Sequence, residues 1–413
     1  MPLSLALAAL LALVSGASGQ PPVREPAAAC CTATIRVRVP EGTGTVYLAG
    51  SLPELGPWRA DGRLMAGEGR ERTAEVTAPP GTTFEYKFTL GSWDREALGP
   101  AGAVPPNYRL VLAHDTVLVH DIAGFKKDVR EYIIDWRGSG VLGRLVYWTD
   151  VRSAFLGPTR NVEIWLPPGY DSSTSARYPV LYMSDGQNLF DPRIANTGVD
   201  WGVDEAVVRL VRRGVIPPII VVGVWSSAER SAEYSPWHGA PQYARFLIEE
   251  LMPRVNREFR TLTGPANTAA MGSSMGGLLS FFLVAHHPEA FGACGCLSTA
   301  FVLSEAWAAR YLRGSVPAGA PDTTPYVIRD IASGLRVPAA TRYWFDYGGL
   351  GIDSAFGPTH EAVRAWLQRQ GLVEGRDFVI RRYAEATHNE ASWRARLEDP
   401  LTFLFGRRRS PTR

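Results

Sequence analysis

The stretch at residues 268–286 reads TAAMGSSMGGLLSFFLVAH and decides how the second part of the chain folds. Residues 269–271 are typical of a buried strand, and residues 278–286 are typical of a helix. Residues 272–276, GSSMG, fit the pattern G-x-S-x-G, in which glycines let a strand and a helix approach closely around an exposed serine. Backbone N–H groups at the start of such a helix can stabilise a developing oxyanion. We therefore predict Ser274 as a nucleophile, against the alternative of a turn without catalytic meaning.

Strand-like and helix-like segments alternate on both sides of this turn, over residues 144–406. Such alternation predicts an α/β fold with a mostly parallel sheet that is covered by helices. The strands are expected at residues 177–183, 219–224, 269–272, 291–297, 343–347 and 378–383, and the helices at 242–259, 278–286 and 361–372.

A serine nucleophile needs a histidine base and an acid that orients the imidazole. In α/β-hydrolases these groups follow along the chain in the order serine, acid, histidine. His388 is the best placed of the seven histidines, because it follows the last expected strand in a polar loop. Asp353 is the first choice for the acid, because it lies in a glycine-rich loop after a strand. Asp346 is the second choice, since a position inside the strand favours a structural role.

The first part of the chain, residues 32–124, follows a different pattern. Ile35 and Val37 alternate with Arg36 and Arg38, and this period of two is typical of a half-buried strand. Similar short runs recur with turn residues between them, which predicts a small all-β sandwich. A charged and then glycine-rich stretch at residues 125–143 is interpreted as a linker to the α/β domain at 144–406.

The N-terminus predicts export. Residues 1–14 are apolar but too short to span a bilayer, and small residues follow them, which is typical of a secretory signal peptide at residues 1–19. Residues 20–31 are interpreted as a Pro/Ala-rich linker. We expect a secreted or periplasmic protein without membrane attachment after signal removal, and a lipid anchor at Cys30 is the less favoured alternative.

For Cys294 and Cys296 we favour buried thiols in the strand at 291–297.

Composition limits the classes of function. The 413 residues are 46% hydrophobic and 20% charged, which is enough for a large packed core and more than one domain. The formal charge is only +2, so a nucleic-acid-binding surface is not expected. Residues 138–143, GSGVLG, fit a dinucleotide-binding pattern, but a strand follows them instead of a helix. Because Cys and His also lack metal-ligand spacing, we expect neither a cofactor nor a metal.

Four segments of the second part resemble the family of α/β-hydrolases described as "Putative esterase". This family includes feruloyl and acetyl esterases, enterochelin-type siderophore esterases, S-formylglutathione hydrolase and mycolyltransferases. The resemblance covers residues 144–406 and implies an α/β-hydrolase fold that acts on carboxylic esters. The segments are residues 182–191 (YMSDGQNLFD), 201–205 (WGVDE), 272–277 (GSSMGG) and 388–393 (HNEASW).

The family resemblance also implies roles for individual residues. The backbone N–H groups of Met275 and Gln187 would form the oxyanion hole. Trp201, in the second segment, is a candidate substrate-binding residue. Arg230, Glu233 and Tyr234 resemble a family stretch near the active-site loop, and a structural ion pair is an equal alternative for them.

The first part resembles starch-binding and glycogen-binding modules. In such modules two tryptophans form a platform for sugar rings, which implies this role for Trp58 and Trp93, with Lys87 beside them. The equal alternative is a domain that binds no sugar and uses its tryptophans for packing. The resemblance rests on residues 46–58 (VYLAGSLPELGPW), 84–88 (FEYKF) and 92–94 (SWD).

Together these observations predict a secreted serine esterase of feruloyl- or acetyl-esterase type. It is expected to hydrolyse a carbohydrate-linked carboxylic ester through Ser274, His388 and Asp353, and its ester substrate is either a small molecule or attached to a polysaccharide. Hydrolysis of a siderophore ester, or transfer of an acyl group, is an alternative within enzymes. A carbohydrate-binding protein with a vestigial hydrolase domain is the alternative from another class.

Overall fold

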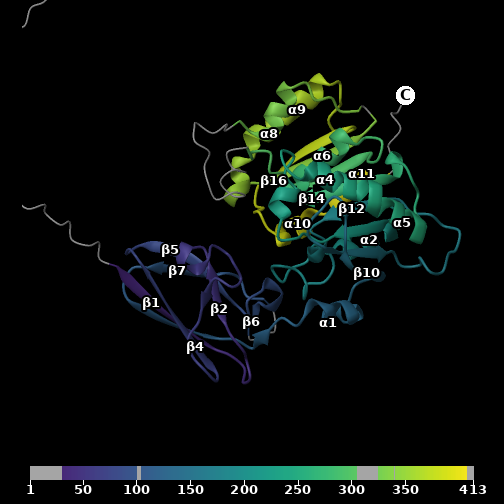
Figure 1. Cartoon of the computed structure of the whole chain (residues 1–413). Coiled ribbons are helices and arrows are strands. Elements are labelled where there is room, and N and C mark those ends of the chain that lie inside the picture. The colour runs from purple at the N-terminus through teal and green to yellow at the C-terminus, as the bar shows by residue number, and fades with distance from the viewer. Residues whose placement is uncertain (1–29, 100–103, 305–323, 339, 407–413) are drawn as a thin grey trace, which may run out of the picture. The chain divides into compact units, whose positions relative to one another are not determined.

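The computed structural model describes residues 30–99, 104–304, 324–338 and 340–406. They form two compact units (Figure 1), and the first combines the described chain up to Phe88 with Asn107–Asp121. The second contains Thr89–Pro106 and the chain from Ile122 onward. Residues 89–106, predicted as part of the sandwich, therefore belong to the second unit. The predicted signal peptide lies outside the described residues, and none of the described helices is long and apolar enough to cross a membrane.

The first unit is rich in β-structure and contains two sheets. In one sheet, β1 (Cys31–Arg38) pairs antiparallel with β4 (Glu71–Ala78) and parallel with β8 (Thr116–Asp121). The predicted alternation in β1 is confirmed, because Ile35 and Val37 are fully buried. The second sheet has the order β3-β2-β5-β7, formed by β3 (Arg63–Leu64), β2 (Tyr47–Gly50), β5 (Thr82–Thr89) and β7 (Tyr108–Leu112).

An eight-stranded sheet forms the centre of the second unit, in the order β10-β11-β13-β12-β14-β15-β16-β17. The pairs β10–β11 and β11–β13 are antiparallel and the other pairs are parallel, so the predicted mostly parallel sheet is confirmed. The carboxyl ends of the parallel strands meet at one edge, where α/β folds place their functional loops. The strands are β10 (Arg144–Val151), β11 (Arg160–Leu166), β12 (Val180–Ser184), β13 (Ile220–Val224), β14 (Thr268–Ser273), β15 (Ala293–Leu297), β16 (Arg342–Gly348) and β17 (Phe378–Tyr383).

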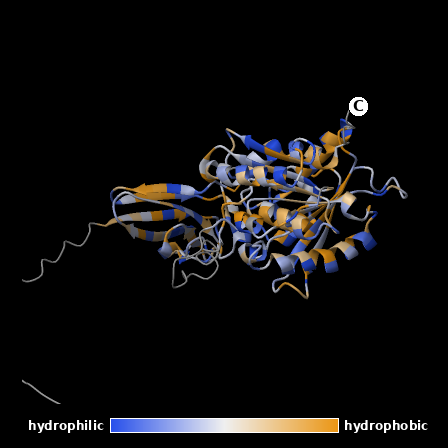
Figure 2. Cartoon of the chain, turned by 90° about the horizontal axis from the view of Figure 1, so that it is seen from above, coloured by the Kyte–Doolittle hydropathy of each residue, from blue (hydrophilic) through white to orange (hydrophobic). Residues whose placement is uncertain are grey.

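Helices cover both faces of this sheet. In β12, Tyr182 packs in a core cluster that includes residues of α6, whereas Leu181 and Met183 pack in a second cluster with α2 and α11. The apolar interior of the second unit is visible as orange segments in Figure 2. The predicted helix at 242–259 is α4 and α5 joined by π-helical turns at Phe246–Leu251. The helices are α1 (Val129–Ile134), α2 (Val203–Arg212), α3 (Arg230–Glu233), α4 (Ala240–Arg245), α5 (Met252–Glu258), α6 (Met275–His286), α8 (Tyr326–Ala332), α9 (Gly357–Arg369), α10 (Glu390–Arg396) and α11 (Glu398–Phe405).

The stretch predicted as a linker, residues 125–143, is an ordered part of the second unit. It contains α1, and β9 (Gly124–Phe125) pairs with β6 (Ala97–Leu98). The Lys126 ammonium is buried and lies 3.9 Å from the equally buried Glu96 carboxylate. These contacts attach residues 89–106 to the second unit, and the local charge and glycine content gave no sign of them.

The cysteines are free thiols, and Cys294 and Cys296 are buried in β15. Burial raises the pKa of the Cys296 thiol, and the neighbouring Cys294 raises it further. A protonated, buried thiol is a poor nucleophile, so this pair packs as part of the core.

Replacing Lys126 by Met should destabilise the second unit. It removes a hydrogen bond of 3.0 Å to the Ala195 carbonyl oxygen and takes the ammonium away from the buried Glu96. Removing one partner of a buried ion pair costs on the order of 3 kcal/mol, which urea unfolding would measure. Lys127→Met is the control, since its ion pair with Glu131 is exposed and is worth less than about 1 kcal/mol. Equal stability of the two variants would contradict the anchoring role of Lys126.

Candidate active site

Ser274 lies at the turn between β14 and α6, with φ 57° and ψ −121°. A residue other than glycine rarely adopts a positive φ, so its surroundings must hold it there. The Ser274 N–H donates to the Leu297 carbonyl oxygen at 2.9 Å, and the Ser274 carbonyl oxygen accepts from the Ala300 N–H at 3.2 Å and the Leu278 N–H at 3.1 Å. The turn is therefore fixed by helix α6 and by the chain around the end of β15.

The glycines of the turn allow β12 to end directly against it. A Cβ on Gly272 would collide with Ser184 Oγ and lie 2.7 Å from the Gly276 carbonyl carbon. A Cβ on Gly276 would collide with the same Ser184 oxygen. Gly272 therefore excludes a side chain because backbone atoms occupy the space, whereas at Gly276 the collision is with the Ser184 hydroxyl alone. Glycines at both positions agree with the G-x-S-x-G pattern.

His388 and Asp353 form a hydrogen-bonded pair, with 2.5 Å between His388 Nδ1 and Asp353 Oδ1. Asp353 is fully buried, and its Oδ2 accepts from Ser298 Oγ at 2.5 Å and from the Gly348 N–H at 2.8 Å. Burial acts to raise the pKa of the Asp353 carboxyl, but the hydrogen bonds from His388, Ser298 and Gly348 outweigh it and lower the pKa. Asp353 is therefore a stable anion that can hold the imidazole in one tautomer.

The imidazole of His388 packs edge-on against two aromatic rings. Its centroid is 5.9 Å from that of Phe356 and 5.2 Å from that of Trp393. The next residue, Asn389, caps α10 by accepting a hydrogen bond of 2.9 Å from the Ser392 N–H. Helix α10 thus begins directly after the histidine and packs against it.

Asp346, the second choice for the acid, has other partners. Its Oδ1 accepts from Arg396 Nε at 3.1 Å and Nη2 at 2.9 Å, and its Oδ2 accepts from Trp344 Nε1 at 2.9 Å. Both members of the Asp346–Arg396 pair are buried. The structure thus brings Asp353 to His388 and assigns Asp346 to a buried ion pair inside the sheet.

The two residues predicted for the oxyanion hole lie at the ends of neighbouring strands. Met275 is the first residue of α6, so its N–H has no acceptor within the helix. Gln187 lies in a 3-10 turn after β12, and its side chain is held by Ser226 through bonds of 2.7 and 3.1 Å. A Cβ on Gly186 would lie 2.6 Å from the Gly223 carbonyl carbon, so this turn also depends on a glycine.

Arg230 and Glu233 take part in two separate ion pairs. Arg230 binds the Asp185 carboxylate through Nε at 2.6 Å and Nη2 at 2.7 Å. Asp185 begins the Gln187 turn with φ 57°, so this ion pair supports a second positive-φ residue of the site. Glu233 binds Arg160 with two hydrogen bonds of 2.8 and 2.9 Å. The stretch therefore forms ion pairs, and through Arg230 it also contacts the Asp185 loop, so the contacts agree with both interpretations.

The predicted substrate-binding residues differ in exposure. Trp201 is only 1% exposed and packs against Trp393, so we correct its assignment: it belongs to the core. Lys87 is 9% exposed, so burial also removes it from a sugar-binding surface. Trp58, in the first unit, and Trp93, in the second, are each exposed by about a third.

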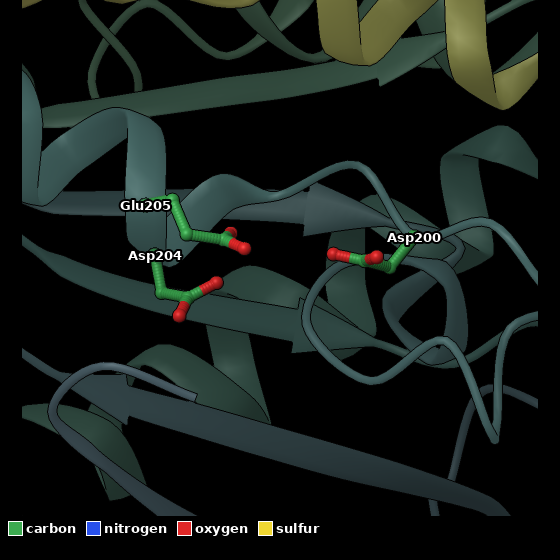
Figure 3. A group of neighbouring side chains, drawn as sticks. All are labelled: Asp200, Asp204 and Glu205. Carbon is green, nitrogen blue, oxygen red and sulfur yellow. The ribbon is translucent and has the colours of Figure 1, made fainter. Parts of the chain in front are cut away.

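Three carboxylates, those of Asp200, Asp204 and Glu205, converge at the start of α2 (Figure 3). Arg394 binds two of them, Asp200 at 2.6 Å and Glu205 at 2.9 Å. Burial, and then the hydrogen bond with Glu205, raises the pKa of the Asp204 carboxyl to about 8. The Arg394 guanidinium and the raised pKa of Asp204 thus reduce the negative charge of this group, and we assign no metal to it.

Sequence reasoning missed the residues behind the acid, chiefly Ser298 and Arg396. Ser298 Oγ accepts from Trp393 Nε1 at 2.9 Å and from Arg396 Nη2 at 2.8 Å. The sequence held one signal for Arg396. Residues three apart on a helix share a face, so a helix after His388 would place Arg396 on the same face as Trp393. Ser298 had no such signal, since only its hydrogen bonds with Trp393 and Arg396 of α10 reveal its place.

Comparison with known proteins places this site in a family. Residues 153–404, more than half of the chain, match the family described as "Putative esterase", and the chain belongs to this family. It is 25% identical over 155 residues to the uncharacterized protein YbbA of Bacillus subtilis (strain 168), covering 34% of this chain and 57% of that protein. It is 26% identical over 193 residues to an endo-1,4-beta-xylanase/feruloyl esterase of Xylanibacter ruminicola, covering 43% of this chain and 23% of that protein.

A solved structure of a ferulic acid esterase superposes with a TM-score of 0.50 at 18% identity, covering 64% of this chain and 98% of that one. This similarity and the sheet order establish the α/β-hydrolase fold of the second unit. Residues 153–404 therefore have both the sequence pattern of this family and the fold of a solved esterase. The chain spans a little over half the length of one curated relative and under a quarter of the other.

The two aspartates should respond differently to substitution. Asp353→Asn should lower kcat by about 10³-fold or more, because an amide cannot hold the imidazole tautomer or stabilise its charge. Asp346→Asn should lower stability by on the order of 3 kcal/mol and change kcat much less, because it breaks a buried ion pair. Steady-state kinetics and urea unfolding on the same samples would measure both. A larger kcat loss in Asp346→Asn would move the acid to Asp346.

Proposed function

We propose that this chain is a secreted serine esterase that hydrolyses a carbohydrate-linked carboxylic ester through a Ser274–His388–Asp353 triad. The observation that carries the proposal is the 2.5 Å hydrogen bond between His388 and the fully buried Asp353, together with the strained turn at Ser274. A buried acid, an oriented imidazole and a serine at a helix N-terminus are the parts that acyl transfer needs.

The reaction would proceed in two halves. His388 Nε2 takes the Ser274 proton as Oγ attacks the ester carbonyl, and the N–H groups of Met275 and Gln187 stabilise the oxyanion. The tetrahedral intermediate collapses, His388 returns the proton to the leaving alcohol, and an acyl-enzyme remains. Water then attacks the acyl-enzyme with His388 as the base, which releases the acid and regenerates Ser274.

The sugar-linked substrate class rests on two supports. A relative that covers 43% of this chain carries the name endo-1,4-beta-xylanase/feruloyl esterase. Trp58 exposes about a third of its surface on the first unit, where an aromatic ring can stack on a sugar. The proposal of secretion is based on the signal-peptide pattern of residues 1–19. Cell fractionation would show whether the protein stays in the cytosol or is exported.

A siderophore esterase, or an acyltransferase, is the alternative for the same triad. Turnover of a cyclic catecholate ester without turnover of a feruloylated xylo-oligosaccharide would favour the siderophore ester. An ester product that appears only when a sugar acceptor is added would favour acyl transfer. Retention on polysaccharide without turnover of any ester would favour a carbohydrate-binding protein.

Ser274→Ala should lower turnover of methyl ferulate and p-nitrophenyl acetate by several orders of magnitude, because the covalent step is lost. The matched control is the adjacent Ser273→Ala, since Ser273 is a buried residue of β14 and should not react. Burst kinetics would show whether the acyl-enzyme forms. An essential Ser273 beside a dispensable Ser274 would refute the assignment of the nucleophile.

Polysaccharide affinity should depend on Trp58. Trp58→Ala should weaken retardation of the intact protein in starch or xylan gels by several-fold, since a stacked ring is worth roughly 1 kcal/mol. Leu64→Ala is the control, because Leu64 is an exposed apolar residue of the same unit without an aromatic ring. Trp93→Ala tests the second predicted tryptophan separately. Unretarded migration of the unmodified protein in each polysaccharide gel would end the binding hypothesis.

A further inference from the structure

Ser298 stands directly behind the acid of the triad. It follows β15, is fully buried, and has a φ of 42°, in the left-handed region that residues other than glycine rarely adopt. Its Oγ is 2.5 Å from Asp353 Oδ2, on the side of the carboxylate away from His388. A strained, buried serine in contact with a triad carboxylate calls for an explanation beyond packing.

The direction of the Ser298 hydroxyl is determined by its neighbours. Trp393 Nε1 and Arg396 Nη2 lie 2.9 and 2.8 Å from Ser298 Oγ, and both groups can only donate. They occupy both lone pairs of the hydroxyl oxygen. Its one proton must therefore go to Asp353 Oδ2, and the hydroxyl cannot turn away without leaving two buried donors unsatisfied.

The charged groups around this hydroxyl pair with Asp346 and not with Asp353, so the two buried aspartates have different roles. The Arg396 guanidinium binds Asp346 through two nitrogens and also reaches Ser298. The Ser298 backbone N–H donates to Asp346 at 3.0 Å. Asp346 is therefore neutralised, whereas Asp353 keeps a net negative charge that faces His388 and can stabilise the imidazolium formed during turnover.

We propose that Ser298 is a positioning residue of the triad, whose hydroxyl locks the Asp353 carboxylate and couples it to Trp393 and Arg396 on helix α10. The proposal rests on the triad function proposed above. Because α10 begins directly after His388 and Trp393 packs on the imidazole, one helix sets the positions of both the base and its acid.

Loss of the hydroxyl has two expected consequences. The Asp353 carboxylate can rotate, which misplaces His388 by a fraction of an ångström. It also loses one of the three hydrogen bonds that lower the pKa of its carboxyl, so this pKa rises. Among the described residues, the charged or titratable groups near the pair include Asp346, Arg396, Glu390 and His360. Burial lowers the pKa of His360 to about 4, so this ring stays neutral at the pH of an esterase assay.

Kinetics of Ser298→Ala on methyl ferulate in the full-length protein would test this role. We expect kcat to fall about 10- to 100-fold, because small misplacements of a catalytic group have effects of this size. KM should change less than about twofold, since the side chain is buried behind the acid. The acid limb of the kcat/KM profile should move to higher pH, which a loss of folded protein would not cause.

Thr299→Val is the matched control. Thr299 is the next residue and is equally buried, but its hydroxyl donates only to the Cys296 carbonyl oxygen at 2.7 Å. We expect a loss of stability and an unchanged pH profile. Ser298→Cys keeps a weak donor and should give an intermediate kcat, which preserves the test if Ser298→Ala does not fold.

The outcomes separate this inference from the proposed function. If Ser298→Ala and Ser298→Cys keep the kcat and pH profile of the unmodified protein, while Ser274→Ala is inactive, the positioning role is refuted and the triad stands. If Ser274→Ala remains active, the triad itself is refuted. A pH shift of the same size in Thr299→Val would show a general effect of buried hydroxyl loss and would also refute the role of Ser298.

Discussion

The close approach of β12 to the turn after β14 is the constraint on which the rest of the site depends. Ser184 Oγ lies where a Cβ of Gly272 or Gly276 would have to be. This contact brings the loop after β12, with Asp185 and Gln187, beside the N-terminus of α6. The two predicted oxyanion donors are about 90 residues apart in the chain. They can lie side by side because the two glycines have no side chain that would push the segments apart.

Electrostatics then distinguishes groups that look alike in the sequence. Asp346 and Asp353 are both fully buried, but only Asp346 receives a guanidinium. Burying an unpaired carboxylate is costly, and Asp353 offsets that cost with three hydrogen bonds. Its charge stays directed at His388. The same principle holds at the start of α2, where Arg394 pairs with Asp200 and Glu205, and burial raises the pKa of Asp204.

The division of the chain into two units depends on contacts between residues far apart in the sequence, and no local sequence pattern predicts such contacts. Residues 89–106 were predicted as part of the sandwich and residues 125–143 as a linker. In the structure β6 pairs with β9 and Lys126 lies beside Glu96 inside the second unit. Trp201 and Lys87 show the same limitation at the level of single residues. Resemblance to binding residues placed them at a surface, and the packing of the chain buried them.

The sequence alone determined the mostly parallel sheet, the strand–turn–helix around Ser274, and the candidates His388 and Asp353. Hydrophobic periodicity along neighbouring residues indicates the strands and helices, and the G-x-S-x-G pattern indicates the turn. The order serine, acid, histidine along the chain then selects the two candidates. Only the tertiary structure decided that Asp353, and not Asp346, reaches His388, and that Ser298 and Arg396 stand behind it. Those contacts join β15, β16 and α10, and hydrogen bonds between residues 50 to 100 positions apart depend on how the sheet and helices pack, which no local pattern encodes.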